Sequence, residues 1–130
     1  MKAVDTNIVV RLITGDDAQQ ASLAMTFLEA QPVLVTLSVA LEGECVLRSA
    51  YRWSRADIAN ALTAFAALDR VEFEEPAGIG WAIARMRDGA DFADLIHAIS
   101  ARGTDAFATF DRQLATRAGP ETPVQIETLT

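Results

Sequence analysis

The chain has 130 residues, which corresponds to about one domain that is large enough to bury a proper core. Apolar residues make up 51% and charged residues 22%, which excludes a disordered acidic tail. One cysteine and one histidine exclude an internal disulfide, a thiolate zinc site and a histidine-rich metal centre. No apolar run approaches the ~20 residues that a membrane span needs, so we expect a soluble, cytoplasmic protein.

The net charge of −7 argues against strong binding to nucleic acid, because contacts with phosphate dominate that affinity. Ten of the eleven basic residues are arginine, which binds phosphate in a bidentate manner. Carboxylates that hold metal cations also stop repelling a phosphate substrate once the cations are bound. The charge therefore does not exclude a nuclease whose acids bind metal.

Short apolar runs alternate with stretches of helical periodicity along the whole chain. In chain order we predict a strand at 2–5, a helix at 7–13, a helix capped by Asp16 or Asp17 that runs to about Ala30, and a strand at 33–37. A helix that Ser38 caps and that reaches Trp53 follows, then a helix from Ser54 to about 68, a strand at 71–73 and a helix after Pro76. The last elements are a helix from Asp91 to Gly103, a strand at 106–110, a short helix capped by Asp111 and a strand at 124–129.

Strands that alternate with helices indicate an α/β fold with a parallel sheet covered on both faces. We therefore expect a three-layer α/β/α sandwich with four or five strands, formed by residues 1–130 as a single domain. In such sheets ligands bind beyond the carboxyl ends of the strands. Asp5 and Asp111 both follow a predicted strand, so we expect them at that edge.

Most of the eighteen acids fit helix starts, turns or exposed strand faces, but four do not. Asp5 ends an apolar strand where solvent access is poor, and Asp111 follows another strand. Glu42 has apolar neighbours one turn away and no base, whereas Glu44 has Arg48 four residues later and suits an exposed ion pair. Asp94 lies on a face of small residues opposite the apolar stripe of its helix. Helix capping remains an alternative for Asp94 and Asp111, and exposure to water at the helix edge remains one for Glu42.

Grouped carboxylates need a reason to be together. Two of them ~5 Å apart repel by roughly 3 kcal/mol at an effective dielectric constant of ~20. Divalent cations remove this cost, and Mg²⁺ or Mn²⁺ suits ligands that are all oxygen. Two such ions can activate water and hold the leaving oxygen in phosphodiester hydrolysis, without histidine or cysteine. Asp5, Glu42, Asp94 and Asp111 are therefore candidates for a metal-dependent nuclease site.

Four segments, in order, resemble the PIN-domain family, particularly the VapC-type toxins of toxin–antitoxin pairs. They are Val4-Asp5-Thr6-Asn7-Ile8, the stretch from Leu41 to Tyr51 with Glu42, Asp91-Phe92-Ala93-Asp94-Leu95-Ile96 and Thr109-Phe110-Asp111. The first and third motifs are specific as a pair, and the other two are loose. Cys45 departs from the tryptophan that relatives often have nearby.

The resemblance implies a Mg²⁺- or Mn²⁺-dependent endoribonuclease with Asp5, Glu42, Asp94 and Asp111 as its catalytic acids. Asp5, Asp94 and Asp111 would ligate the metal, and Glu42 would ligate it or orient the attacking water. Thr6, Asn7 and Thr109 would support the carboxylates by hydrogen bonds. The resemblance also implies an RNA substrate, a homodimer and a cognate antitoxin protein that blocks the site.

Other readings remain open. A PIN-like fold could be retained as a binding module without catalysis, although acids stand at all four positions. A receiver-type phosphoacceptor domain needs a lysine after a late strand, and Lys2 is the only lysine. Gly78-Ile79-Gly80 lacks the third glycine of a dinucleotide loop. A phosphatase with an Asp-x-Asp nucleophile does not fit, because position 7 is Asn.

Overall fold

The computed structural model describes residues 1–130, which form seven helices and five strands in two compact units. Unit 1 spans Met1–Glu74 and unit 2 spans Glu75–Thr130. Every strand pairing is parallel, which confirms the expected mixed α/β class. The five strands pair as three in unit 1 and two in unit 2. No helix has the length and apolarity needed to cross a membrane.

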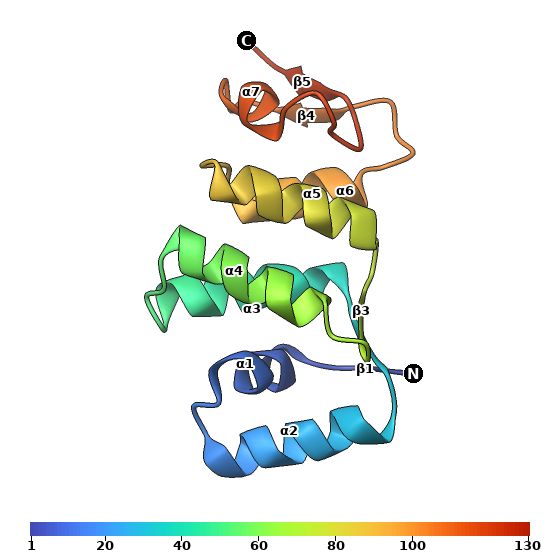
Figure 1. The fold of residues 1–130 in the computed structure, drawn as a ribbon. Coiled ribbons are helices and arrows are strands. Elements are labelled where there is room, and N and C mark those ends of the chain that lie inside the picture. The colour runs from blue at the N-terminus through green and yellow to red at the C-terminus, as the bar shows by residue number, and fades with distance from the viewer. The chain divides into compact units, whose positions relative to one another are not determined.

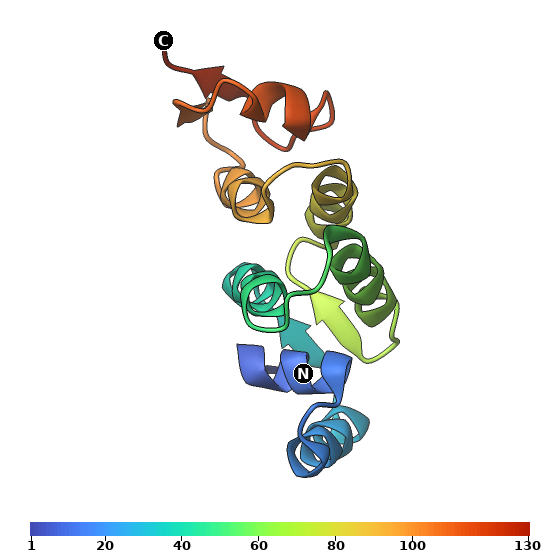
Figure 2. The ribbon, with the colours of Figure 1, turned by 90° about the vertical axis from the view of Figure 1, so that its left-hand side faces the viewer.

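Unit 1 contains a three-stranded sheet and four helices (Figure 1). Its elements are β1 (Lys2–Ala3), α1 (Thr6–Thr14), α2 (Ala18–Ala30), β2 (Val33–Val35), α3 (Leu37–Ser49), α4 (Arg55–Ala66) and β3 (Val71–Phe73). The sheet order is β1-β2-β3, with Lys2 opposite Val33 and Val33 opposite Val71. Helices α1 and α2 pack together, and α3 packs against both α1 and α4 (Figure 2).

Side-chain caps determine where the helices of unit 1 begin. Of the two predicted caps of α2, Asp17 is the one that accepts a hydrogen bond from the Gln20 amide, at 2.9 Å. Ser54 accepts one from the Asp57 amide at 3.1 Å, as expected. Ser38, however, is not the cap of α3, and that prediction was wrong. Strand β2 ends at Val35, so the cap is Thr36, whose hydroxyl accepts from the Val39 amide. The helix also ends at Ser49, before the predicted Trp53.

Unit 2 contains a two-stranded sheet and three helices. Its elements are α5 (Pro76–Arg87), α6 (Phe92–Ser100), β4 (Phe107–Thr109), α7 (Leu114–Ala118) and β5 (Ile126–Thr128). Phe107 lies opposite Ile126 in the sheet. The indole of Trp81 donates to the Ala118 carbonyl at 3.0 Å, and Arg85 donates to the Arg117 carbonyl at 2.6 Å. These two bonds attach the end of α7 to α5.

Each unit has its own apolar core, built from one face of each helix and from the strands. The largest fully buried side chains of unit 1 are Val10, Val33, Val35, Leu47 and Ile58. Those of unit 2 are Ile79, Met86, Phe92, Leu95 and Ile99. Burial of such side chains stabilises a fold by about 1.5–3 kcal/mol each relative to exposure. The cores fix α1, α3 and α6, the helices that present Asp5, Glu42 and Asp94.

Candidate active site

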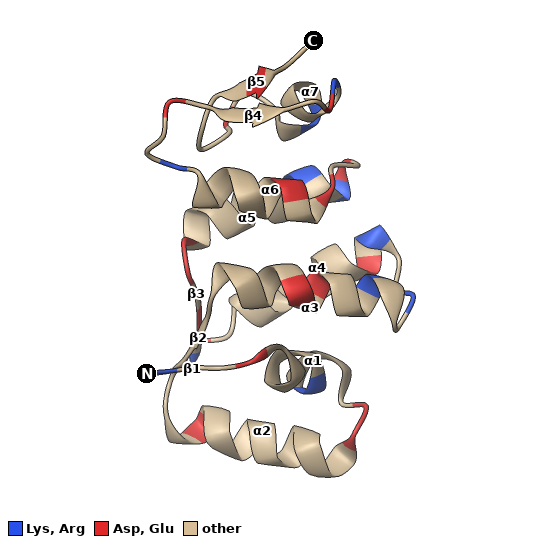
Figure 3. Ribbon diagram, turned by 180° about the vertical axis from the view of Figure 1, so that it is seen from behind, with Lys and Arg blue, Asp and Glu red and all other residues tan.

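Asp94 lies in the first turn of α6, and its helix is oriented by a buried apolar face. Asp91 caps the helix, because its Oδ1 atom accepts from the Ala93 amide at 3.1 Å. Phe92, Leu95 and Ile99 are buried, whereas Asp94 is half-buried. Acidic residues along α3 and α6 are visible in Figure 3. The expected placement of Asp94 away from the core face of α6 is therefore confirmed.

Burial raises the pKa of the Asp94 carboxyl above its ordinary value of 3.8. The negative charges of Asp91 and, to a smaller extent, Asp111 raise this pKa further, and the charge of His97 lowers it. Asp94 and Asp111 are thus near enough within unit 2 to interact electrostatically. A carboxylate in this position is stabilised by a cation, because a cation offsets both the desolvation and the repulsion. Perturbed carboxyl groups of this kind are typical of functional sites.

Asp111 follows β4 at its carboxyl end and is exposed. The Thr109 hydroxyl accepts from the Asp111 amide at 3.0 Å, and the Asp111 Oδ1 atom accepts from the Gln113 amide at 2.9 Å. The prediction that Asp111 caps the short helix was wrong, because α7 begins at Leu114 after Gln113. Asp111 instead closes the turn that precedes the helix. Thr109 supports the backbone of Asp111, which fixes the turn that presents this acid.

Asp5 stands where β1 passes into α1 in unit 1. The strand ends at Ala3, so the predicted strand to Asp5 was too long. Asp5 is exposed, so the expectation of poor solvent access was wrong. It caps α1, with its Oδ1 atom accepting from the Ile8 amide at 3.1 Å. The positive end of the helix dipole favours a carboxylate at this position, which explains why Asp5 caps α1 although it was predicted to end a strand. Thr6 is buried, and Asn7 is exposed on the first turn.

Glu42 and Glu44 differ in burial, and Glu42 has the exposed position that the sequence left as one of two possibilities. Glu42 is exposed on α3, whereas Glu44 is 4% exposed and forms an ion pair with Arg48. The predicted pairing of Glu44 with Arg48 is confirmed, but the prediction that Glu44 is exposed was wrong. The next helix, α4, packs against α3, and the sequence pattern of α3 alone did not reveal which side it would cover. Glu42 is therefore the acid of this pair that is accessible to a ligand.

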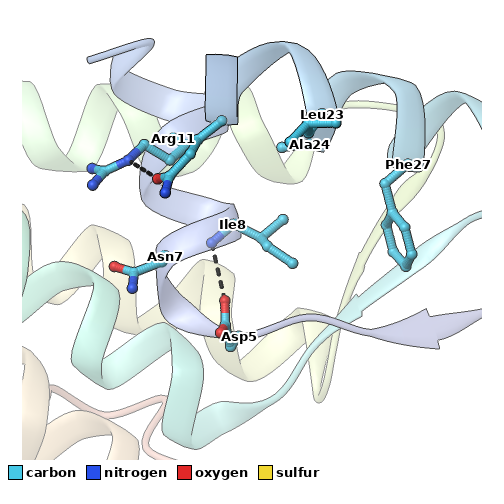
Figure 4. Close-up of a pocket in the computed structure, with 8 residues that line it drawn as sticks. Asp5, Asn7, Ile8, Arg11, Leu23, Ala24 and Phe27 are labelled. Carbon is cyan, nitrogen blue, oxygen red and sulfur yellow. Dashed lines mark hydrogen bonds between the residues drawn. The ribbon is translucent and has the colours of Figure 1, made fainter. Parts of the chain in front are cut away.

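A pocket of about 420 Å³ lies between α1 and α2 in unit 1, and the sequence analysis did not predict it (Figure 4). Asp5 is one of its lining residues, together with Asn7, Ile8, Arg11, Gln20, Leu23, Ala24 and Phe27. Arg11 donates to Gln20 at 2.8 Å and to the Tyr51 hydroxyl at 2.9 Å. The only sequence feature that could have indicated this pocket is the spacing of Leu23 and Phe27 on one face of α2. Apolar residues at that spacing, however, usually indicate a face that packs in the core.

The donor chemistry of these residues fits a hard divalent cation. Asp94 and Asp111 in unit 2, and Asp5 and Glu42 in unit 1, offer only carboxylate oxygen, which Mg²⁺ and Mn²⁺ prefer. Within either unit, no group of three or more His, Cys, Asp and Glu side chains is arranged to hold a metal ion. The observation in favour of a cation is the half-buried Asp94 beside two like charges. Asp94 is thus the residue of unit 2 best suited to bind one.

Comparison with known protein families gives one match. The family model described as the PIN domain matches residues 2–120, which covers nearly the whole chain and includes all four candidate acids. No curated protein matches the chain. The matched range spans both units and contains the Asp5, Glu42, Asp94 and Asp111 positions on which the resemblance was based. The chain belongs to the PIN domain family.

Proposed function

We propose that this PIN domain is a metal-dependent endoribonuclease, formed by residues 1–130 as one nuclease domain. PIN domains are generally nucleases, and the family frequently occurs in toxin–antitoxin systems. The observation that carries the proposal is the raised pKa of Asp94 beside the negative charges of Asp91 and Asp111. Without a cation this repulsion disfavours the ionised Asp94, and a bound divalent cation would remove it.

Asp5 of unit 1 and Asp94 and Asp111 of unit 2 are the residues that would hold Mg²⁺ or Mn²⁺, and Glu42 would ligate the metal or orient the attacking water. When bound, the metal supplies an activated water and stabilises the negative charge that develops on phosphate. The chain's own contribution is to orient the acids. The Thr109 hydroxyl holds the turn of Asp111, and the charge of His97 favours the ionised form of Asp94. Thr6 and Asn7 follow Asp5 on α1 and would support its carboxylate.

We further propose that the protein is the cytoplasmic toxin of a type II toxin–antitoxin pair and acts as a homodimer. The net charge of −7 and the single lysine make free RNA a poor competitor against a partner that carries arginine. Guanidinium pairs with carboxylates in a bidentate manner, so a cognate antitoxin should present Arg or Lys to Asp5 and Asp94. Such a partner would compete with divalent metal, and raising the Mg²⁺ concentration should weaken a complex centred on these acids.

The antitoxin proposal is tested by co-purification of the protein with the product of the neighbouring gene, followed by cleavage assays with and without that product. Tight binding and inhibition are expected. A neighbour that neither binds nor inhibits would contradict the toxin–antitoxin proposal, while the nuclease proposal would stand or fall on the cleavage assay. The alternative of a silent PIN-like binding module predicts binding of a partner without any cleavage.

The nuclease proposal is tested by sequencing RNA ends after brief expression of the wild type, of Asp5→Asn and of Glu29→Gln. Glu29 is an exposed acid near the end of α2 in the same unit and serves as the matched control. New RNA ends are expected with the wild type and Glu29→Gln, and not with Asp5→Asn. Equal RNA ends in all three samples, or purified protein that cleaves RNA in excess EDTA, would refute the proposed metal-dependent site.

A further inference from the structure

The pocket between α1 and α2 combines apolar walls with polar groups at its ends (Figure 4). Its volume of about 420 Å³ lies within the range of roughly 300–1,000 Å³ that is typical of small-ligand sites. Asp5 and Asn7 line it at the N-terminus of α1, and Arg11 lines it further along the same helix. Arg11 follows Asp5 by six positions, which in an α-helix corresponds to about 9 Å of axial rise.

The apolar wall of the pocket remains open to solvent. Leu23 is 64% exposed although it lies on a helix that packs against α1, and Ile8 and Phe27 line the pocket with it. Exposed leucine beside a concave apolar surface costs free energy in water, which a flat apolar ligand would recover. The Lys2 ammonium lies 5.6 Å from the centre of the Phe27 ring, so a cation already stands beside this wall.

The polar groups of the pocket suit a nucleotide. Arg11 is held in place by bonds to Gln20 and to the Tyr51 hydroxyl, which reduces the entropy that it would lose on binding a phosphate. Asn7 and Gln20 carry amide groups that can hydrogen-bond the edge of a base. Phe27 offers an aromatic ring, and Lys2 adds positive charge next to it. A flat apolar group joined to an anion matches this arrangement.

We propose that this pocket binds one unpaired nucleotide of the RNA substrate, with its base against Ile8, Leu23 and Phe27 and a phosphate toward Arg11. This inference rests on the proposed function, because Asp5 is both a pocket-lining residue and a proposed metal ligand. A base in a duplex is stacked and paired and cannot enter a pocket, so the arrangement selects single-stranded RNA. The pocket would thereby fix which nucleotide lies beside Asp5.

The test measures binding rather than cleavage. Fluorescence anisotropy would report the affinity of the full chain, in EDTA and with Asp94→Asn to prevent hydrolysis, for a short labelled single-stranded RNA of mixed sequence. The second probe is an oligonucleotide with the same backbone but with abasic positions throughout. Base-dependent binding is expected, with the base-bearing RNA bound more tightly than the abasic backbone. Phe27→Ala should weaken binding of the base-bearing RNA about tenfold, because stacking of a base on an aromatic ring is worth ~1–3 kcal/mol.

Leu23→Ala is the decisive variant, because this exposed side chain can be shortened without loss of core packing. Met25→Ala is its matched control, since Met25 is a large apolar side chain on the same helix, 47% exposed and outside the pocket. We expect Leu23→Ala to reduce affinity for the base-bearing RNA several-fold, with no effect on the abasic probe. Met25→Ala should leave both affinities unchanged. Melting temperatures of both variants should match that of the parent.

Three results would overturn the nucleotide pocket. One is equal affinity for the base-bearing and abasic probes. The second is an equal effect of Leu23→Ala and Met25→Ala. The third is that Leu23→Ala weakens binding of a co-purifying protein and not of RNA, which would make the pocket a protein-docking surface. Failure of the proposed nuclease function would be recognised by a different result, namely no cleavage of RNA by the wild type in Mg²⁺. The binding measurements are made without metal and would still test the pocket.

Discussion

In α3, the Arg48 Nε atom lies 3.0 Å from the Glu44 Oε2 atom, one helical turn away. The Glu44 side chain is 5% exposed and that of Arg48 is 55% exposed, so the ion pair joins a buried acid to a base at the surface. Two residues earlier in the same helix, Glu42 is exposed. We therefore expect different roles for the two glutamates. Glu44 stabilises the helix through its ion pair, and Glu42 is accessible to a ligand.

This difference predicts opposite effects of one chemical change. Glu44→Gln removes the charge from a buried ion pair and should lower the free energy of unfolding by about 1 kcal/mol, a value reduced because Arg48 is half in water. Glu42→Gln should leave stability unchanged and reduce metal-dependent RNA cleavage. Thermal melting and a cleavage assay on both variants give the answer. If only Glu44→Gln abolishes cleavage, the catalytic acid of α3 is Glu44 and the assignment of Glu42 is wrong.

Asp94→Asn should abolish metal-dependent cleavage and leave the metal-free protein as stable as the wild type, or more stable. The substitution removes a charge that is disfavoured by burial and by the charges of Asp91 and Asp111. Asp105→Asn, at an exposed position of unit 2, is the control and should change neither property. Melting curves in EDTA and cleavage assays in Mg²⁺ test this expectation. A marked fall in melting temperature without metal would identify Asp94 as a structural cap.

Divalent metal should stabilise the wild type against thermal unfolding more than it stabilises Asp94→Asn. A ligand that binds only the folded state raises stability in proportion to the logarithm of its concentration above the dissociation constant. Melting temperatures across a Mg²⁺ titration would measure the difference, with Ca²⁺ as a comparison ion. Identical shifts in the two proteins would mean that Asp94 is not a metal ligand.

The raised pKa of Asp94 predicts a specific dependence of stability on pH. Between the ordinary value of 3.8 and the raised value, the folded state holds a proton that the unfolded state has lost. Stability contributed by this group is therefore full below 3.8 and falls as pH rises through the folded pKa. The melting temperature of Asp94→Asn minus that of the wild type should be near zero at low pH and grow with pH. A difference that does not depend on pH would contradict the assignment.

Two glycines of α5 provide a test of packing in unit 2. A Cβ atom on Gly80 would meet nothing within 4 Å, whereas one on Gly78 would lie 3.2 Å from the side chain of Ile99 in α6. Gly80→Ala should raise the free energy of unfolding by about 1 kcal/mol through helix propensity. Gly78→Ala should give a smaller gain or a loss, because Ile99 must shift. Chemical denaturation of both variants measures the difference in the free energy of unfolding. Equal increases would show that Ile99 can shift without cost to accommodate a methyl group at position 78.

Local sequence chemistry determined most of the secondary structure of this protein. Asp17 and Ser54 begin helices because their side chains accept amide hydrogen bonds, and Gly15 ends α1 in the left-handed conformation that glycine adopts without strain. The strand at Val71–Phe73 was predicted to the residue, because two apolar residues alternate with Glu72 shortly before a proline. The motifs around Asp5 and Asp94 likewise indicated the family, which the match over residues 2–120 confirms.

Tertiary contacts decided what the local pattern left open. Helix α3 has apolar residues on more than one side, so only its packing against α1 and α4 determined that Glu44 is buried and Glu42 exposed. Asp94 has a raised pKa chiefly because the fold of unit 2 half-buries it, and further because Asp91 and, seventeen residues away in sequence, Asp111 lie near enough for their charges to act on it. The pocket between α1 and α2 exists because the two helices leave Leu23 uncovered. Burial and electrostatic coupling depend on distances between elements in space, and the periodicity of one helix does not reveal those distances.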